Sequence, residues 1–576
     1  MKLKNYISKI FFLLGDDKKK VPLLIMAFIF LSLIEIVGLG LIAPYISLIS
    51  EENSFQQLNI FFDVNFSINK WVYLFSLLLV VVFVLKLIFS ITLNYFLISF
   101  SEEQRLKTRT KLMNFYQNLP YEEYSRRKSS DYIFNIGTVA SNYAGNTLYY
   151  FMKLSSDLIF IVFISIFLIY QNFLAFSLMA SLLILFTFIY NLYFQKKLIR
   201  NGKMVNKENN SLLKFINESM QGFKEIKIYK IEKFFFDGLE KSAQKFKNFY
   251  VPSALISQAP KFLVELIFVI FLCLIISITF ILDFSKEKLF ATLVIFAVAS
   301  LRLLPIISSI SSSISIIRFN FDTIDIIFLD LKNEKKYFKE ERKISNKKLN
   351  FSSLHLENIS FKYKNQKEFA IENISLNIKQ GTSVGIIGES GSGKTTLIDI
   401  LLGILKPQEG KIFLDNDPAK MSLDNWRESI AYMPQEVFIS DDSLKQNIAL
   451  GEEEINIEKV IESINRSGLS DFLEGLEDGV DTKFGDRGER LSGGQRQRIA
   501  LSRFFYKDRK VIFMDESTSS LDYESEKEIN KEIDKLGSEY TKFIISHKKE
   551  SVRNCDLIIK LKKGKIEEVG QPDEIL

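Results

Sequence analysis

The sequence contains very little cysteine or histidine. Among 576 residues there are two cysteines, Cys273 and Cys555, and two histidines, His355 and His547. Because the cysteines fall in very different segments, neither a disulfide framework nor a cysteine-based metal site is expected, and two histidines exclude a histidine-rich metal site. A strong charge excess is also missing. Lys and Arg count 74 against 68 Asp and Glu, a net charge of +6, so no nucleic-acid partner is expected.

Long apolar runs, in contrast, are abundant. Hydrophobic residues make up 47% of the chain and Phe alone counts 53, which indicates membrane spans. The run 21–50 is too long for the apolar core of a signal peptide and lacks an obvious cleavage site, so we expect a retained first transmembrane helix. Five further runs, making six spans in all, lie near residues 71–100, 155–170, 173–194, 262–282 and 289–317.

Basic residues are distributed asymmetrically around these spans. Segments after the second and fourth spans are rich in Lys and Arg, whereas the opposite loops are short or acidic. By the positive-inside rule, both termini of this multi-pass protein should be cytoplasmic. Residues 1–20 interleave lysines with apolar residues and should form an amphipathic cytoplasmic helix on the membrane surface. Abundant Lys, Asn, Ile and Phe indicate an AT-rich bacterial genome, so we expect a bacterial inner membrane as the location.

Two cytoplasmic excursions interrupt the spans, at about 101–150 and 195–258. Each is long enough for a helix down, a short turn and a helix back, with the turns near 120–131 and 222–235. Short transverse helices at these turns would be natural contacts for a cytoplasmic domain.

The chain changes character after the last span. Residues 331–350 are charged and poor in apolar residues, as a linker would be. Short strand patterns follow. We therefore expect a six-helix transmembrane domain over 21–330 and a soluble domain over 351–576, which is long enough to bury its own core.

The soluble domain contains a phosphate-binding loop, Gly388–Thr395, which fits G-x-x-x-x-G-K-[ST]. Val384–Ile387 before it predict a buried strand and Thr396–Leu402 after it a helix, the context that the motif requires. The glycines allow backbone N–H groups to close around phosphate oxygens at a helix N-terminus. Lys394 is expected to reach the β- and γ-phosphates of a nucleoside triphosphate, and the Thr395 hydroxyl to hold Mg²⁺.

Two further motifs suit the same chemistry. Val511–Glu516 is an apolar strand that ends in two carboxylates, of which Asp515 would organise the Mg²⁺ shell and Glu516 would polarise the attacking water. Leu491–Gln495 opens a helix rich in Arg and Gln, and its Ser-Gly-Gly start is another anion-binding device.

The order of these motifs resembles the nucleotide-binding domain of ATP-binding-cassette (ABC) transporters, whose signature matches Leu491–Gln495. Tyr363 matches the aromatic residue that stacks on adenine, and Gln435 the loop that senses Mg²⁺ and meets the membrane domain. His547 matches the γ-phosphate switch histidine. Residues 519–522 match the dimer-contact loop, with Ser520 where Ala is usual. The fold implied is that of a type I ABC exporter, with an α-helical transmembrane domain and an α/β P-loop NTPase domain.

The resemblance also implies individual roles. Glu516, His547 and Gln435 would be catalytic, and Thr395, Gln435 and Asp515 would bind Mg²⁺. The residues implied in ATP binding are Tyr363, Gly388, Ser390, Gly391, Gly393, Lys394, Thr395, Thr396, Ser492, Gly493, Gly494, Gln495 and Asp522. In this family the phosphate loop of one domain and the signature of another enclose each ATP. A chain with one nucleotide-binding domain should therefore be a half-transporter that forms a homodimer.

Charged residues within the spans bear on the cargo. Glu35, Lys86, Lys261, Glu265 and Arg302 lie in or at the edges of spans, where charges are costly and should face an aqueous cavity or each other. Three bases against two acids leave a surplus that would suit an anionic substrate such as a diphosphate. The alternative is internal ion pairing. The Ser-rich run 308–315 indicates close helix packing first, and a polar cavity lining second.

The whole chain resembles the PglK-type flippases of lipid-linked oligosaccharides. Lys86, Lys261 and Arg302 fall where that family carries basic residues facing the cavity, with Lys in place of Arg at the first two. The resemblance implies ATP-driven transfer of an undecaprenyl-diphosphate oligosaccharide across the bilayer, with Glu35 as a further cavity residue. The alternatives are an exporter of a peptide, an exporter of lipid A or a drug-like lipophile, and an ATPase that transports nothing.

Overall fold

A computed structural model describes residues 2–50, 66–281, 286–334, 351–364, 366–415, 423–485, 488, 490–517, 521 and 523–576. Within these ranges only the backbone is described for residues 2–4, 39, 42–44, 46–50, 279–281, 286–302, 423–424 and 523. The chain divides into two compact units. A membrane unit comprises Met1–Leu119 and Arg126–Lys339, and a nucleotide-binding unit comprises Pro120–Ser125 and Glu340–Leu576.

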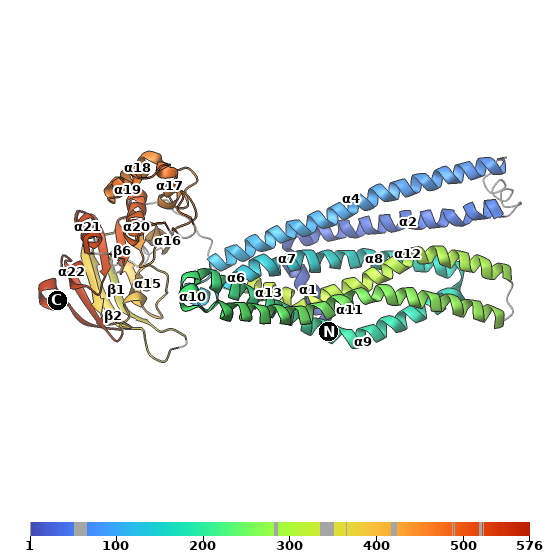
Figure 1. The fold of residues 1–576 in the computed structure, drawn as a ribbon, viewed down its shortest axis with the longest axis horizontal. Coiled ribbons are helices and arrows are strands. Elements are labelled where there is room, and N and C mark those ends of the chain that lie inside the picture. Colours follow the sequence, from blue (N-terminus) through green and yellow to red (C-terminus); the bar gives the residue numbers. More distant parts are fainter. Residues whose placement is uncertain are drawn as a thin grey trace. The chain divides into compact units, whose positions relative to one another are not determined.

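The membrane unit is a bundle of long helices (Figure 1). Its elements are α1 (Lys2–Leu14), η1 (Gly15–Lys20), α2 (Val21–Ser50), α4 (Ile68–Gln117), α6 (Ser129–Phe134), η2 (Asn135–Val139), α7 (Ala140–Asn142), η3 (Tyr143–Leu148), α8 (Tyr149–Gln171), α9 (Phe173–Gln221), α10 (Phe223–Tyr229), α11 (Glu232–Ile281), α12 (Lys286–Phe319) and α13 (Phe321–Lys332). The 50 residues of α4 rise about 75 Å at 1.5 Å each, more than the ~30 Å hydrocarbon core of a bilayer.

Five helices of the described residues are long and apolar enough to cross a membrane. A sixth span is added if the pair Leu303–Phe319 and Phe321–Lys332, bent by 48°, is counted as one. The turns of the two excursions lie at α5 (Tyr121–Tyr124) and α10, within the stretches expected from the sequence. Of these, α5 belongs to the nucleotide-binding unit.

The N-terminal helix α1 packs against protein. Ile10, Leu13 and Leu14 are buried in the core formed by α4 and α13, and Tyr6 stacks on Phe321 with ring centroids 3.8 Å apart. Ile10, Leu13 and Leu14 therefore serve helix packing, while contact of this helix with the membrane surface stays a prediction.

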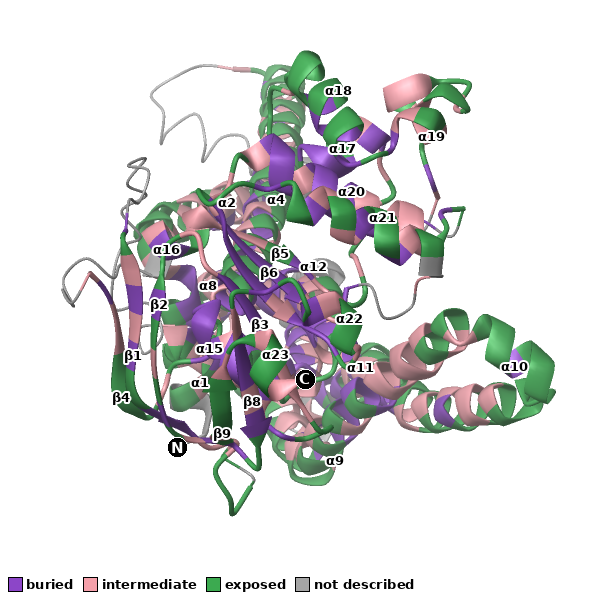
Figure 2. Ribbon diagram, turned by 90° about the vertical axis from the view of Figure 1, so that its left-hand side faces the viewer, coloured by how far each residue is buried: buried purple, intermediate pink, exposed green. Residues whose placement is uncertain are grey.

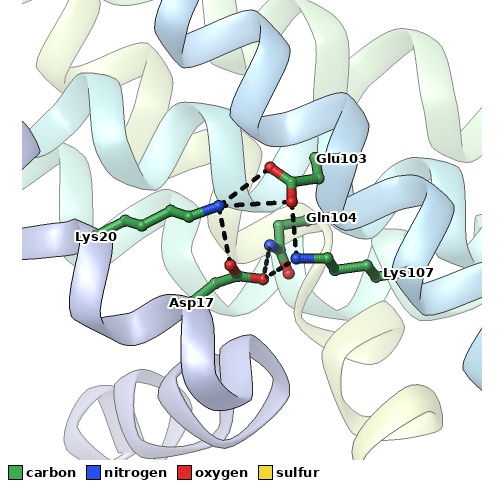
Figure 3. A network of polar contacts seen from close by, with 5 residues as sticks. All are labelled: Asp17, Lys20, Glu103, Gln104 and Lys107. Atoms are coloured by element: carbon green, nitrogen blue, oxygen red, sulfur yellow. Dashed lines mark hydrogen bonds and ion pairs between the residues drawn. The ribbon is translucent and has the colours of Figure 1, made fainter.

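A network of charges fixes η1 to α4 (Figure 3). The Asp17 carboxylate lies 2.6 Å from Lys107 Nζ and 3.1 Å from Lys20 Nζ, and it accepts a hydrogen bond of 2.7 Å from Gln104. Glu103 contacts the same two lysines. Each carboxylate therefore has two cationic partners, which holds the start of α2 beside the C-terminal half of α4.

The nucleotide-binding unit contains two sheets. The strands are β1 (Ser353–Phe361), β2 (Ile371–Lys379), β3 (Ser383–Gly388), β4 (Glu409–Leu414), β5 (Ile430–Met433), β6 (Val511–Asp515), β7 (Thr541–Ile545), β8 (Leu557–Lys562) and β9 (Lys565–Gly570). An antiparallel sheet has the order β2-β1-β4, and a six-stranded sheet has the order β5-β6-β7-β3-β8-β9, parallel except at β9.

Helices surround the six-stranded sheet. They are α15 (Lys394–Leu401), α16 (Leu423–Ser429), α17 (Leu444–Ile448), α18 (Ile457–Arg466), α19 (Ser470–Glu474), α20 (Gly493–Lys507), α21 (Tyr523–Asp534), α22 (Lys549–Val552) and α23 (Pro572–Ile575). Strands β3 and β6 are almost wholly buried (Figure 2), and Phe513 and Phe543 stack between β6 and β7 with centroids 4.4 Å apart. This apolar sheet presents the carboxyl ends of its parallel strands as a rigid edge, where ligands bind in open α/β sheets.

Candidate functional site

The phosphate-binding loop joins β3 to α15, as the sequence predicts. Gly388 and Gly393 have φ of 151° and 104°, which L side chains rarely adopt. A Cβ atom at Gly393 would lie 2.5 Å from the Ala370 carbonyl oxygen, and one at Gly388 would lie 2.3 Å from that of Leu561. Both positions therefore require glycine, and the loop can pass close to its neighbours while its N–H groups remain at the N-terminus of α15.

Lys394 is 6% exposed and its ammonium donates to the carbonyl oxygens of Gly388 and Glu389, at 2.9 and 3.0 Å. Burial lowers the pKa of Lys394, an effect opposed by the nearby charges of Glu516 and Asp515. The ammonium is thus held at the loop, between the loop carbonyls and the two carboxylates, where a triphosphate would be its strongest partner.

A cavity of about 970 Å³ opens beside the loop. It contains most of the residues expected to bind the nucleotide in this subunit, namely Tyr363, Ser390, Gly391, Gly393, Lys394, Thr395, Thr396, Glu516 and His547. Tyr363 also lies with its hydroxyl 3.2 Å from that of the buried Thr396, which fixes the ring at the cavity wall.

The two carboxylates after β6 differ in environment. Burial raises the pKa of Asp515, and the charge of Glu516 raises it further, whereas Lys394 lowers it. The Tyr432 hydroxyl donates to Asp515 Oδ2 at 3.3 Å. Glu516 has φ of 47° and lies 2.8 Å from His547, Oε1 to Nε2. The left-handed backbone of Glu516 and the contact of its carboxylate with an imidazole fix the position of that carboxylate, which suits a role in orienting water.

The residues fit Mg²⁺ held jointly with a triphosphate. Among the described residues, no group of three or more His, Cys, Asp or Glu could hold a metal ion alone. Thr395 and Asp515 supply oxygen ligands near the loop, and a cation would stabilise the ionised form of the buried Asp515. Gln435 is exposed and does not line the cavity.

The signature residues lie elsewhere on this unit. Ser492 caps α20, where its Oγ accepts from Gln495 N–H at 3.2 Å and its own N–H donates to Gln495 Oε1 at 2.8 Å. None of the residues Ser492–Gln495 lines the cavity described above. The structure of one chain therefore brings the phosphate loop, Glu516 and His547 together but leaves the signature apart from them. Asp522 and residues 519–520, in the expected dimer-contact loop, lie outside the described residues.

Two features of this site were missed by the sequence analysis. Gln497, 2% exposed on α20, donates to the carbonyl oxygens of Pro434 and Gln435 at 3.1 Å, so the signature helix holds the Gln435 loop directly. Lys563 and Lys565, at the turn between β8 and β9, line the nucleotide cavity. Their only signal in the sequence was a Lys-Gly-Lys turn between two short apolar segments.

Two of the charged residues expected within the spans form an ion pair in the membrane unit. Lys86 Nζ lies 2.7 Å from Glu35 Oε1, and the two side chains are 15% and 16% exposed. This is the internal ion pair that the sequence analysis gave as the alternative to substrate contact. Lys261 and Glu265 are exposed on α11. The Arg302 side chain lies outside the described residues.

A second cavity, of about 490 Å³, lies in the membrane unit among η3, α8, α11 and α12. Its polar lining consists of Asn146, Tyr150, Lys153, Tyr250, Ser253, Ser257, Gln258, Ser308, Ser309, Ser312 and Asn320. The Ser-rich run has both of its expected roles, because Ser308, Ser309 and Ser312 face the cavity whereas Ser313 and Ser315 are buried. Neither Lys153 nor Asp157 was predicted from the sequence; the Asp157 carboxylate accepts a hydrogen bond from Ser309 at 2.6 Å.

Known proteins match both units. Residues 21–304 match the family described as ABC transporter transmembrane region, and residues 371–519 match ABC transporter. An ATP-dependent lipid A-core flippase of Saccharophagus degradans is 33% identical over 371 residues, 62% of this chain and 60% of that protein. The alpha-hemolysin translocation ATP-binding protein HlyB of Proteus vulgaris is 40% identical over 220 residues, 38% of this chain and 31% of HlyB. The matched segments thus span less than two thirds of either relative.

The fold has a counterpart among solved structures. A bacterial Atm1-family ABC exporter with ATP bound aligns with a TM-score of 0.75, covering 98% of this chain and 96% of that one. Because the two sequences are 18% identical, the likeness concerns the fold alone.

Proposed function

The chain has the type I ABC exporter fold, with one transmembrane region and one nucleotide-binding domain, and on that basis we propose that it is an ATP-driven half-transporter of a bacterial inner membrane. The observation that carries this proposal is the cavity in which Lys394, Thr395, Glu516 and His547 meet. The basic segments after the second and fourth spans support cytoplasmic termini.

In this proposal each residue of the cavity has a separate role in ATP hydrolysis. Lys394 and the loop N–H groups bind the β- and γ-phosphates, while Tyr363 stacks on the base. Thr395 and Asp515 would hold Mg²⁺, whose charge would offset that of the phosphates, with Gln435 as the residue proposed to sense it. Glu516 orients and polarises the attacking water, and His547 holds the Glu516 carboxylate and contacts the γ-phosphate.

Two copies of the chain complete each ATP site. Ser492–Gln495 are remote from the cavity of their own chain, and the start of α20 offers free N–H groups that suit a phosphate. A homodimer with two equivalent sites therefore follows, in which Asp522 and its neighbours contact the partner. Gln497 joins this signature helix to the Gln435 loop, so closure over ATP is passed toward the membrane unit.

The proposed cargo is a lipid-linked oligosaccharide that carries a diphosphate. The cavity in the membrane unit supports this class, because its hydroxyl and amide groups match a sugar-bearing headgroup and Lys153 matches an anion. Lys261 and Arg302 remain proposed contributors to anion binding, whereas Lys86 is assigned to the ion pair with Glu35. A second candidate is lipid A or a similar lipophile, which the match to a lipid A-core flippase over 62% of the chain favours. Peptide export is a third candidate.

Assays in proteoliposomes test the identity of the cargo. The purified protein is assayed for ATPase stimulation and for leaflet transfer with a polyprenyl-diphosphate oligosaccharide, with lipid A and with a peptide in separate arms. We expect the first arm to respond. A response only to lipid A or to peptide would refute the oligosaccharide proposal and select that alternative instead.

Two variants sharpen this assay. Lys153→Gln should reduce transfer about tenfold with basal ATP hydrolysis retained, because it removes the cavity's cation. Lys245→Gln changes an exposed lysine of α11 outside the cavity and serves as the matched control. Equal transfer by the two variants would show that the cavity does not receive the headgroup.

A further inference from the structure

The chain crosses between the two compact units at three places. It leaves the membrane unit after Leu119, returns at Arg126, and leaves again beyond α13. The excursion Pro120–Ser125 contains α5, which is tied into the nucleotide-binding unit by Glu123, with Oε1 2.7 Å from Lys364 Nζ. The residues that flank these crossings are therefore where the chain links the two units covalently.

One buried carboxylate joins the flanks of all three crossings. Asp330 of α13 has a side chain 6% exposed, and both its oxygens accept from the Arg127 guanidinium, at 2.7 and 2.9 Å. The Tyr116 hydroxyl, near the end of α4, donates to Asp330 Oδ2 at 2.6 Å. Asn135 in turn donates to the Tyr116 oxygen at 2.9 Å. In chain order, Tyr116 precedes the first crossing, Arg127 follows the second, and Asp330 precedes the third.

The contacts that Asp330 makes with Arg127 and Tyr116 form a rigid node. A guanidinium that binds a carboxylate through two parallel hydrogen bonds fixes both planes, and the Arg127 guanidinium also lies 6.0 Å from the centre of the Tyr116 ring. Removing one partner would leave a charge buried and unpaired, which is strongly unfavourable. The end of α4, Arg127 and α13 are thus held in one arrangement.

Packing alone would hold α13 to the bundle. Phe321, Ile324, Ile327 and Leu331 are buried in the same core as the end of α4. The ion pair adds a specific link to that packing, because it joins α13 to Arg127, three residues after the end of α5.

We propose that Asp330, through Arg127 and Tyr116, is the positioning residue that makes the end of α4, the segment that follows α5 and α13 itself move as one body, so that closure of the nucleotide-binding unit is converted into rearrangement of the membrane helices. This inference rests on the proposed ATP-driven transport. Asp330 touches neither nucleotide nor cargo in this account. Its loss uncouples hydrolysis from the membrane unit without removing the catalytic residues.

The test follows the membrane helices without needing the cargo. In the full chain with Cys273→Ser, a spin label at Ile91→Cys, an exposed position of α4, reports the distance between the two copies of a dimer. Distances are measured without nucleotide and after trapping with Mg-ATP and orthovanadate. Asp330→Asn should lose more than half of the distance change seen in the wild type, while its ATP hydrolysis stays within about threefold.

Controls separate coupling from stability. Asp325→Asn lies on the same helix and removes a more exposed pair with Lys9, so it should behave as the wild type. The exchange Arg127→Asp with Asp330→Arg should restore much of the distance change. If Asp330→Asn fails to assemble, Arg127→Lys keeps the charge but loses the bidentate link and should show the same uncoupling.

The outcomes are distinct. A full distance change in Asp330→Asn, or in Arg127→Lys where that variant is needed, would overturn the inference and leave the proposed function intact. A wild-type protein that hydrolyses no ATP would overturn the proposed function on which the inference rests.

Discussion

His547 Nε2 lies 2.8 Å from Glu516 Oε1, at the carboxyl ends of the neighbouring parallel strands β7 and β6. The Glu516 backbone is held as well, because its N–H donates to the Ile545 carbonyl oxygen at 3.1 Å. The register of two buried strands therefore determines where the carboxylate meets the phosphate loop. The first prediction concerns this carboxylate.

Replacing Glu516 by Gln should keep ATP binding and lower the hydrolysis rate at least about 100-fold, because the amide cannot accept a proton from water. Binding is measured with a fluorescent ATP analogue and turnover by phosphate release. Persistent hydrolysis with normal binding would show that another residue activates the water.

Two complementary variants test the shared ATP site. In a mixed dimer of a Lys394→Ala chain and a Ser492→Arg chain, one site loses both its phosphate loop and its signature, whereas the other keeps both. Each variant alone should be inactive, and co-expression should restore part of the wild-type rate. No recovery in isolated mixed dimers would contradict a site built from two chains.

Two glycine variants separate steric clash from backbone strain. Gly391 and Gly393 both have positive φ, 79° and 104°, but only a Cβ atom at Gly393 meets a neighbouring backbone atom, at 2.5 Å. Gly391→Ala should cost about 1–2 kcal/mol in stability through strain alone. Gly393→Ala should cost more and abolish ATP binding, as thermal unfolding and nucleotide binding would show. Equal effects would mean that the contact with Ala370 is easily relieved.

Asp399 should make the nucleotide-binding unit pH-sensitive. Burial, with a contribution from Asp515, raises the pKa of Asp399 to about 6 from its ordinary value of 3.8. The folded state then binds this proton more tightly than the unfolded chain, so the free energy of unfolding falls as the pH rises from about 4 to about 6 and stays lower above that.

Asp399→Asn removes this effect. In the absence of nucleotide and Mg²⁺, the variant should be more stable than the wild type by about 1–2 kcal/mol at pH 7.5, and the difference should vanish below pH 4. The exposed Asp478→Asn is the control. A stability difference that does not change with pH would contradict the assignment.

The pair of Glu35 and Lys86 separates an ion pair from a substrate contact. Glu35→Gln or Lys86→Gln alone should destabilise the protein by about 2–4 kcal/mol, because each leaves a charge in a mostly buried site. The double variant should recover most of the melting temperature and transport normally. A stable double variant that has lost transfer would favour a substrate contact for Lys86.

The nucleotide-binding unit was largely predictable. The strand before the phosphate loop, the helix after it and the paired carboxylates of β6 all rest on contiguous sequence, since the loop needs glycines at fixed spacing and buried strands need apolar runs. The apolar runs likewise predicted the five helices of the described residues that are long and apolar enough to cross a membrane, and a sixth if the bent pair at 303–332 is counted as one span. Gln497 and Lys563 were not predictable, because their roles depend on which distant segments they face.

By itself, the sequence determined that this chain binds a nucleoside triphosphate and that it contains long apolar membrane helices, because those features are coded by residues close together in the chain. Only the tertiary structure decided the partners of isolated charges. It joined Lys86 to Glu35, placed Lys153 and the serines around one cavity, and brought Arg127 to Asp330 across 203 positions of sequence. Such contacts are set by the packing of whole helices, and no local pattern records which helix lies opposite.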